Sequence, residues 1–215
     1  MSAVPAYQDD IFKPIIDGNT LEQAIRDSIR AWWDVYSKEY ALQRGYDNPL
    51  PRPRSWIISQ DVNRDGADQL PTVVVISPGL TGERPTRDGE GNFTAKWSVG
   101  VGIFVAAKNR GSTAKLVREY AAIIRAIVIQ KPTFDGVASY VDWVDESYDD
   151  AFAFRDDETI AAGQVILDVT VEDVLNKFGG PSGDPPPLPD PDTQPGSQWL
   201  PIDKAYVQVE VDVDG

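Results

Sequence analysis

The sequence contains neither cysteine nor histidine. A chain without cysteine forms no disulfide, thiolate zinc site or cysteine nucleophile, and a chain without histidine lacks the commonest general base. The sequence also has no run of 18 apolar residues that could span a membrane, and its first ten residues, MSAVPAYQDD, lack the basic and apolar regions of a signal peptide. These absences argue against most hydrolase and transferase mechanisms. We expect a protein made in a cytoplasm, or used in something assembled there, without a membrane partner.

Basic residues are scarce in two segments of the chain. Residues 134–158 carry nine acidic side chains against one basic one, and residues 179–215 carry seven against one. These two segments account for the whole net charge of -14, so the rest of the chain is balanced. Neither segment can neutralise phosphates, and we therefore do not expect the protein to grip DNA by counterion release. An acidic surface would instead repel DNA.

A helix is predicted over residues 20–43. Asn19 with Glu22, or Thr20 with Gln23, fits a capping box at its start. Gly45 is a natural stop at its end. Apolar and aromatic side chains recur along it at spacings of three or four, which is typical of one buried helix face: Leu21, Ile25, Ile29, Trp32, Tyr36 and Tyr40.

A second helix is predicted to begin at a cap on Ser112 or Thr113 and to end before Pro132. Its broad apolar face predicts that it is largely buried. Runs of β-branched or alternating residues predict strands over 55–60, 70–77, 96–107, 137–144 and 161–174. This order of elements predicts an α+β fold, with a mixed, chiefly antiparallel sheet flanked by two main helices.

The connections between these elements carry further expectations. Residues 78–94 hold four glycines and two charged clusters, so they are predicted to form a long loop that reaches away from the body. Residues 145–150, DESYDD, are predicted to be an acidic connector, and residues 151–155 to be extended. The glycines Gly100 and Gly102 inside a predicted strand indicate a bend or a close approach of backbone.

The composition changes sharply at residue 179. Residues 1–178 are predicted to form the folded domain, residues 179–198 a semi-rigid linker rich in Pro, Gly and Asp, and residues 199–215 a C-terminal arm. The arm contains the period-two pattern YVQVEVDV, which predicts a strand. A strand at the end of a linker needs a sheet edge to pair with, either on its own sheet or on a neighbouring subunit.

The stretch DVNRDG places oxygen-bearing side chains at Asp61, Asn63 and Asp65 before Gly66, which is how a calcium-binding loop begins. The twelfth position of such a loop should be a bidentate Glu but is Thr72, and the flanking residues are predicted to be strands. A hairpin loop with turn-forming side chains explains the pattern more simply. We therefore expect no metal and no other cofactor.

The acidic residues Asp145, Glu146, Asp149 and Asp150 could in principle supply a carboxylate pair for catalysis or hold a divalent ion. Nothing in their spacing selects a pair. A solvated or channel-facing acidic segment is the better interpretation, and we expect no enzyme here.

Six segments together resemble the tail terminator, or tail completion, proteins of long-tailed bacteriophages. They are LEQAIRDSIRAWWDVY, SWIIS, TVVVIS, KWSVGVGIFVAA, TAKLVREYAAIIRAIVIQ and ETIAAGQVILDVTVEDVL. The resemblance covers roughly residues 15–178 and rests on the order of elements, since the family has no catalytic residues. The chain departs from the compact members of this family by its extension over residues 179–215.

The resemblance implies a mixed sheet flanked by helices and a structural role in the virion, at the junction of head and tail. Such proteins form a homohexameric ring on the last ring of tail tube subunits, stop tube polymerisation and meet the head-side connector or stopper protein. DNA passes through the hole of the ring without specific binding. The alternatives are another head–tail joining protein, such as a stopper, neck or tube-like protein, and more remotely an enzyme or a calcium-dependent module.

Under this interpretation two regions are candidates for contacts between subunits. One is the long loop and the strand start after it, and the other is the C-terminal arm. Their residues are Arg84, Arg87, Phe93, Trp199, Tyr206, Val207, Val209 and Val211. The four acidic residues 145, 146, 149 and 150 are the candidates for facing the DNA channel.

Overall fold

The structure, a computed structural model, has the predicted α+β fold, with two main helices and a mixed sheet. It describes residues 16–59, 69–87, 93–155 and 158–175, with the backbone alone for 151–155 and 173–175. The elements in chain order are α1 (Gly18–Arg44), β1 (Ser55–Ile58), β2 (Thr72–Leu80), β3 (Thr86–Arg87), β4 (Phe93–Ala107), α2 (Arg110–Gln130), the short 3-10 helix η3 (Phe134–Gly136), β5 (Tyr140–Arg155) and β6 (Glu158–Leu175).

The strands form one sheet in the order β1-β2-β4-β6-β5, with the short β3 added beside the start of β4. β1 and β2 are parallel, and every other pairing is antiparallel. The centre of the sheet is the long pairing of β4 with β6, which runs from Phe93 opposite Leu175 to Ala107 opposite Thr159. Among the described residues, β1 and β5 are therefore the two outer strands.

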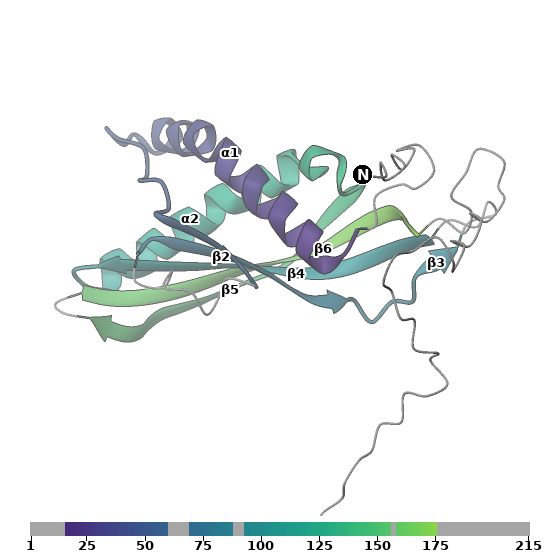
Figure 1. The fold of residues 1–215 in the computed structure, drawn as a ribbon. Helices are drawn as coiled ribbons and strands as arrows, with labels where there is room; N and C mark the ends of the chain where they lie inside the picture. Colours follow the sequence, from purple (N-terminus) through teal and green to yellow (C-terminus); the bar gives the residue numbers. More distant parts are fainter. Residues whose placement is uncertain (1–15, 60–68, 88–92, 156–157, 176–215) are drawn as a thin grey trace, which may run out of the picture.

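Both helices pack on the same face of this sheet, as Figure 1 shows. The alternation of strand side chains explains how one face is buried. On β6 the side chains of Ala161, Val165, Leu167 and Val169 are buried beneath the helices, while their neighbours in between are half-buried or exposed. The core is therefore a single layer between the two helices and one side of the sheet. We call the other side the open face.

The start of α1 differs from the predicted capping box. Asp17 is the N-cap, and its carboxylate accepts a hydrogen bond from the backbone N–H of Thr20 at 2.7 Å. The predictions of Asn19 or Thr20 as caps were wrong, because the helix begins earlier and Glu22 turns into the protein. The predicted stop is confirmed: Gly45 adopts a left-handed conformation with φ of 67°, and the N–H of Tyr46 donates to the carbonyl of Ala41.

Glu22 is a buried carboxylate that joins α1 to two strands. Its side chain accepts hydrogen bonds from the backbone N–H groups of Ser59 at 3.0 Å and Ser77 at 2.6 Å, and also from the Ser59 hydroxyl. Ser77 lies where the pairing of β2 with β4 shifts register, between Ile76 and Gly79. Glu22 thus satisfies a donor in the stretch where the pairing of the two strands is interrupted.

The two helices meet through aromatic side chains. Trp33 of α1 is fully buried and lies 5.0 Å from the ring of Tyr120 on α2 and 6.2 Å from that of Trp56 on β1, between ring centroids. The Tyr120 hydroxyl donates to the carbonyl of Pro51 at 2.6 Å, which gives this buried hydroxyl a partner. Within the described residues, neither helix is long and apolar enough to cross a membrane.

The second helix also begins earlier than predicted. Asn109 is its N-cap and accepts a hydrogen bond from the N–H of Ser112 at 2.9 Å, so the cap is neither Ser112 nor Thr113. An Asn side chain is short enough to reach this N–H, and it caps helices as well as Ser does.

Two of the predicted connections contain strand. The acidic residues 145–150 are not a connector but the middle of β5, which is continuous over Tyr140–Arg155. The β-bulges after Trp143 and Asp149 interrupt the sequence alternation but not the strand. The predicted loop over 78–94 contains the end of β2, the short β3 and the start of β4.

The two hydrogen bonds that Glu22 accepts from backbone N–H groups predict a large effect of its removal. Glu22→Ala should lower the free energy of unfolding by about 2 kcal/mol, because two partly buried N–H groups lose their acceptor. Glu22→Gln should cost less, since one amide oxygen still accepts. Urea unfolding followed by tryptophan fluorescence measures both. The control is Glu39→Ala, whose exposed side chain on the same helix bonds only to Gln43 among described residues. Equal losses for Glu22→Ala and Glu39→Ala would contradict this role.

Candidate functional site

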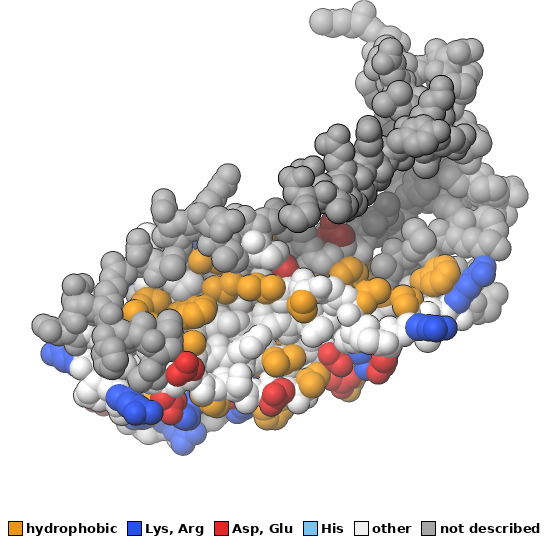
Figure 2. Space-filling model, turned by 90° about the horizontal axis from the view of Figure 1, so that it is seen from below, with side chains coloured by type: hydrophobic (Ala, Val, Ile, Leu, Met, Phe, Trp, Pro, Cys, Tyr) orange, Lys and Arg blue, Asp and Glu red, His pale blue; other side chains and the backbone are white. Residues whose placement is uncertain are grey.

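The open face of the sheet carries a groove of about 1090 Å³. It runs across β1, β2, β4, β6 and β5, on the side opposite the helices. Figure 2 shows this side, with hydrophobic side chains distributed over it. The apolar residues that line it are Ile57, Leu70, Val74, Ile76, Pro78, Phe104, Ile160, Ala162 and Ile166.

Two glycines of β4 line the groove, and they add no side chain to its floor. Gly100 and Gly102 lie on β4, on the side that faces the groove. A Cβ atom at Gly100 would come within 2.5 Å of the side-chain nitrogen of Gln164 on β6, so Gln164 lies across this glycine. The sequence predicted a bend or a close approach of backbone at these glycines, but the group that comes close to Gly100 is a side chain.

The β5 strand divides the acidic candidates between two faces. Glu146 and Asp150 point toward α2, where each meets an arginine. Arg125 forms an ion pair with Glu146, and Arg118 forms one with Asp150 at 2.7 Å. The same two guanidinium groups lie over aromatic rings of β5, Arg125 over Trp143 at 4.7 Å and Arg118 over Tyr148 at 4.8 Å from the ring centroids.

The other two acidic candidates, Asp145 and Asp149, pair with Ile166 and Ala162 of β6 and so belong to the open face. Asp149 lines the groove itself. The side chain of Asp145 accepts a hydrogen bond from the backbone N–H of Glu146 at 2.8 Å. The four acidic residues therefore do not form one cluster, because neighbouring positions on a strand point to opposite sides.

The short β3 strand brings two predicted contact residues together. Arg87 pairs with Phe93 across β3 and β4, and its guanidinium lies 5.7 Å from the centre of the Phe93 ring. Arg84 precedes β3 and is exposed, as Arg87 is. Arg87 and Phe93 thus lie together beside β3, at the end of the sheet where β4 begins (Figure 1).

The remaining candidates lie outside the described residues. They are Asp61, Asn63 and Asp65 of the calcium-like loop, and Trp199, Tyr206, Val207, Val209 and Val211 of the arm. Within the described part of the chain, no group of three or more acidic residues is arranged to hold a metal ion.

The groove is the feature that the sequence analysis did not find. Its signal was present in the run TVVVI of β2, where both alternating sets of side chains are apolar or β-branched. Such a run is typical of a strand covered on both faces. Here Val73 and Val75 are fully buried under the helices, whereas Val74 and Ile76 lie on the open face. The sheet thus carries an apolar surface that the helices do not cover.

No protein-family model matches this chain, and no curated protein matches it. Its function is therefore inferred from its own residues and from the resemblance described above.

The burial of the ion pair between Glu146 and Arg125 predicts that replacing Arg125 destabilises the protein more than replacing Arg118 does. Arg125→Met should lower the free energy of unfolding by about 2 kcal/mol, because it leaves the Glu146 carboxylate, whose side chain is only 8% exposed, without its cation. Adding Glu146→Gln should restore part of this loss. Arg118→Met is the matched control: its partner Asp150 is 31% exposed and stays hydrated, so the loss should be clearly smaller than for Arg125→Met. Equal effects of the two arginine substitutions would contradict this prediction.

The hydrogen bond from Arg118 lowers the pKa of Asp150 below its ordinary value of 3.8. A carboxyl group whose pKa is lowered by folding stabilises the folded state fully above its ordinary pKa, and this stabilisation is lost as the pH falls through the lowered value. Asp150→Asn should therefore be less stable than the wild type near neutral pH, and the two should converge below pH 3.8. Urea unfolding at a series of pH values tests this. A constant difference at every pH would contradict it.

Proposed function

We propose that this protein is a structural subunit of a bacteriophage head–tail joint, of the tail terminator kind. In this proposal six copies form a ring that caps the tail tube, stops its polymerisation and joins the tail to the head-side connector or stopper. DNA passes through the hole of the ring. The role is not enzymatic, and it needs no cofactor.

The open apolar face of the sheet is the observation that carries this proposal. Contiguous apolar surface on a folded protein marks contact sites, because water contact with such a surface is unfavourable. Side chains of five strands contribute to this surface, and both helices are on the other side. An assembly subunit needs a broad surface of this kind, and half of the described residues that line the groove are apolar.

The two outer strands favour a ring over a two-fold dimer. β5 is long and acidic, whereas β1 is short and follows a segment that contains Arg52 and Arg54. Pairing β5 with a second β5 would place like charges opposite each other, which is unfavourable. Contacts between unlike surfaces are heterologous, and they produce closed rings when the rotation between copies closes.

The acidic residues on the open-face side of β5 fit a surface that DNA passes without adhering. Asp145 and Asp149 point to that side, while Glu146 and Asp150 are paired with arginines of α2. We propose that Asp145 and Asp149, rather than all four, belong to the channel or to the ring surface near it. Negative charge there would keep the DNA backbone from binding.

Introducing a charge on the open face tests the ring proposal. Ile76 is 40% exposed on that face, so Ile76→Asp should change the stability of the subunit by only about 1 kcal/mol but prevent assembly. The matched control is Leu42→Asp on α1, where the side chain is 75% exposed. Light scattering at low and high protein concentration, with negative-stain images, measures the assembly of each variant.

The expected result is a closed sixfold ring with a central hole for the wild type and for Leu42→Asp, and monomers for Ile76→Asp. Rings that form equally well with Ile76→Asp would show that the open face is not the contact surface between subunits. Open filaments of the wild-type protein would instead indicate a tube-like protein.

A further inference from the structure

The outer edge of β1 is one of two places where a further strand could join the sheet. Among the described residues, β1 pairs only with β2 and has no neighbour on its outer side. Its side chains alternate: Trp56 and Ile58 face the helices, and Ser55 and Ile57 face the open side. A strand added here would extend both the buried layer and the open face by about 4.8 Å.

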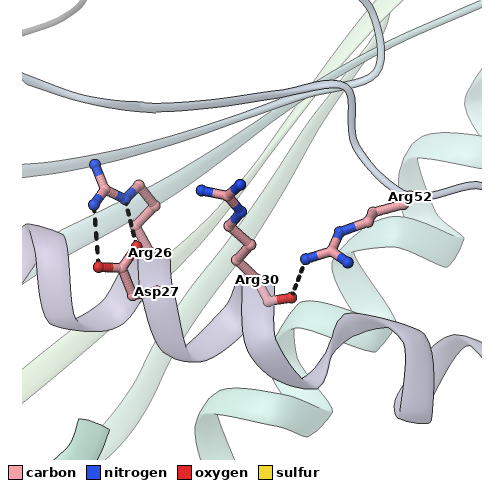
Figure 3. A network of polar contacts seen from close by, with 4 residues as sticks. All are labelled: Arg26, Asp27, Arg30 and Arg52. Atoms are coloured by element: carbon pink, nitrogen blue, oxygen red, sulfur yellow. Dashed lines mark hydrogen bonds and ion pairs between the residues drawn. The ribbon is translucent and has the colours of Figure 1, made fainter.

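Arginines gather above this edge. Arg26 and Arg30 lie one turn apart on α1, and Arg52 comes from the segment that leads into β1. Figure 3 shows Arg26 and Arg30 on the same side of the helix, with Arg52 reaching toward them. Arg52 donates to the carbonyl of Arg30 at 2.8 Å and to the carboxylate of Asp34 at 3.1 Å.

The charges of this group are not balanced within the described residues. Arg26 is paired with Asp27 at 2.9 Å, and Arg52 with Asp34. The guanidinium of Arg30 is exposed and has no acidic partner among the described side chains. Arg54, just before β1, is also exposed and has no such partner. The surface beside β1 therefore carries an excess of positive charge.

One segment of this chain has the complementary pattern. In YVQVEVDV, over residues 206–213, every second residue is Val, and the residues between include Glu210 and Asp212 with no basic side chain. As a strand, this segment would place its valines on one side and its acids on the other. We infer that this segment pairs with the outer edge of β1 on a neighbouring copy, with its acids toward the arginines of α1 and its valines extending the open face.

The other edge of the sheet is a poorer acceptor for this segment. β5 carries Asp142, Asp145 and Asp149 on the open-face side and two more acids on the other. An acidic strand placed there would meet like charges.

A neighbouring copy, rather than the same one, is the acceptor if the protein forms the proposed ring, and the inference rests on that function. Five of the seven residues from 185 to 191 are proline. Such a sequence favours a semi-rigid extended spacer of about 3.1 Å per residue, which carries a strand away from its own body. Exchange of arms between neighbours would then strengthen each contact in the ring.

Cross-linking can test this pairing directly, because the chain has no cysteine of its own. Ser55→Cys on β1 is combined in turn with Val207→Cys, Val209→Cys or Val211→Cys in the full chain. Ser147→Cys is the matched control, since it replaces a serine on the same face of β5. After mild oxidation, a non-reducing gel should show covalent oligomers for a Ser55→Cys pair and none for the Ser147→Cys pairs.

Charge reversal tests the role of the arginines. Arg30→Glu should reduce the yield of that cross-link by about threefold, and Glu210→Lys with Asp212→Lys should restore it. Lys38→Glu makes the same charge change at an exposed position eight residues further along α1 and should leave the yield unchanged.

The outcomes separate this inference from the ring itself. Rings in the electron microscope without a Ser55 cross-link would overturn the arm pairing and leave the ring. Cross-linked copies in dimers or open chains would support the arm pairing and overturn the ring. Links within a single chain would exclude pairing with a neighbouring copy. Cross-links in the Ser147→Cys pairs instead of the Ser55→Cys pairs would show that the arm joins β5 and would overturn the inference.

Discussion

The packing of both helices on one face of the sheet is the constraint on which the rest of this structure depends. It gives β4 and β6 one fully buried set of side chains, and it leaves the alternate set facing outward. A sheet with one solvated face usually carries polar side chains there. In this protein Val74, Ile76 and Ile166 occupy that face instead, and the groove is the result. The open face is thus a direct consequence of where the helices lie.

The same packing determines what the acidic residues can do. On the covered side of β5, the guanidinium groups of α2 neutralise the carboxylates, so these acids hold the helix to the edge of the sheet. On the open side, Asp145 and Asp149 border an apolar surface. A surface that is apolar in the middle and acidic toward one edge suits contact between subunits beside a channel for DNA. It combines burial of apolar area with repulsion of phosphate.

The sequence predicted the elements in which one set of side chains is regularly apolar and the other polar or half-buried. The first helix has a regular apolar stripe and a glycine stop, and β6 alternates along most of its length, so both lie close to their predicted bounds. The acidic half of β5 was missed because its charges point to both faces. The arginines that make this possible, Arg118 and Arg125, come from a different element.

The open face could not be predicted, because the sequence of a single strand does not indicate which side of the sheet the helices cover. In β2 both sets of side chains are apolar, so the pattern is the same whichever face the helices cover. Glu22 shows a similar limit. Its spacing fits a capping box, yet its carboxylate bonds to Ser59 and Ser77, which lie 37 and 55 residues away in the sequence.

Hydroxyl-radical footprinting of the full-length protein would test most directly whether the open face is a contact surface. Oxidation rates of Phe104, Ile76 and Ile166 would be measured by mass spectrometry over a range of protein concentrations, with Leu42 on α1 as the internal reference. The account predicts that the three open-face residues become protected as the protein concentration rises, while the rate at Leu42 stays constant. Open-face rates that remain as high in concentrated as in dilute protein would contradict it.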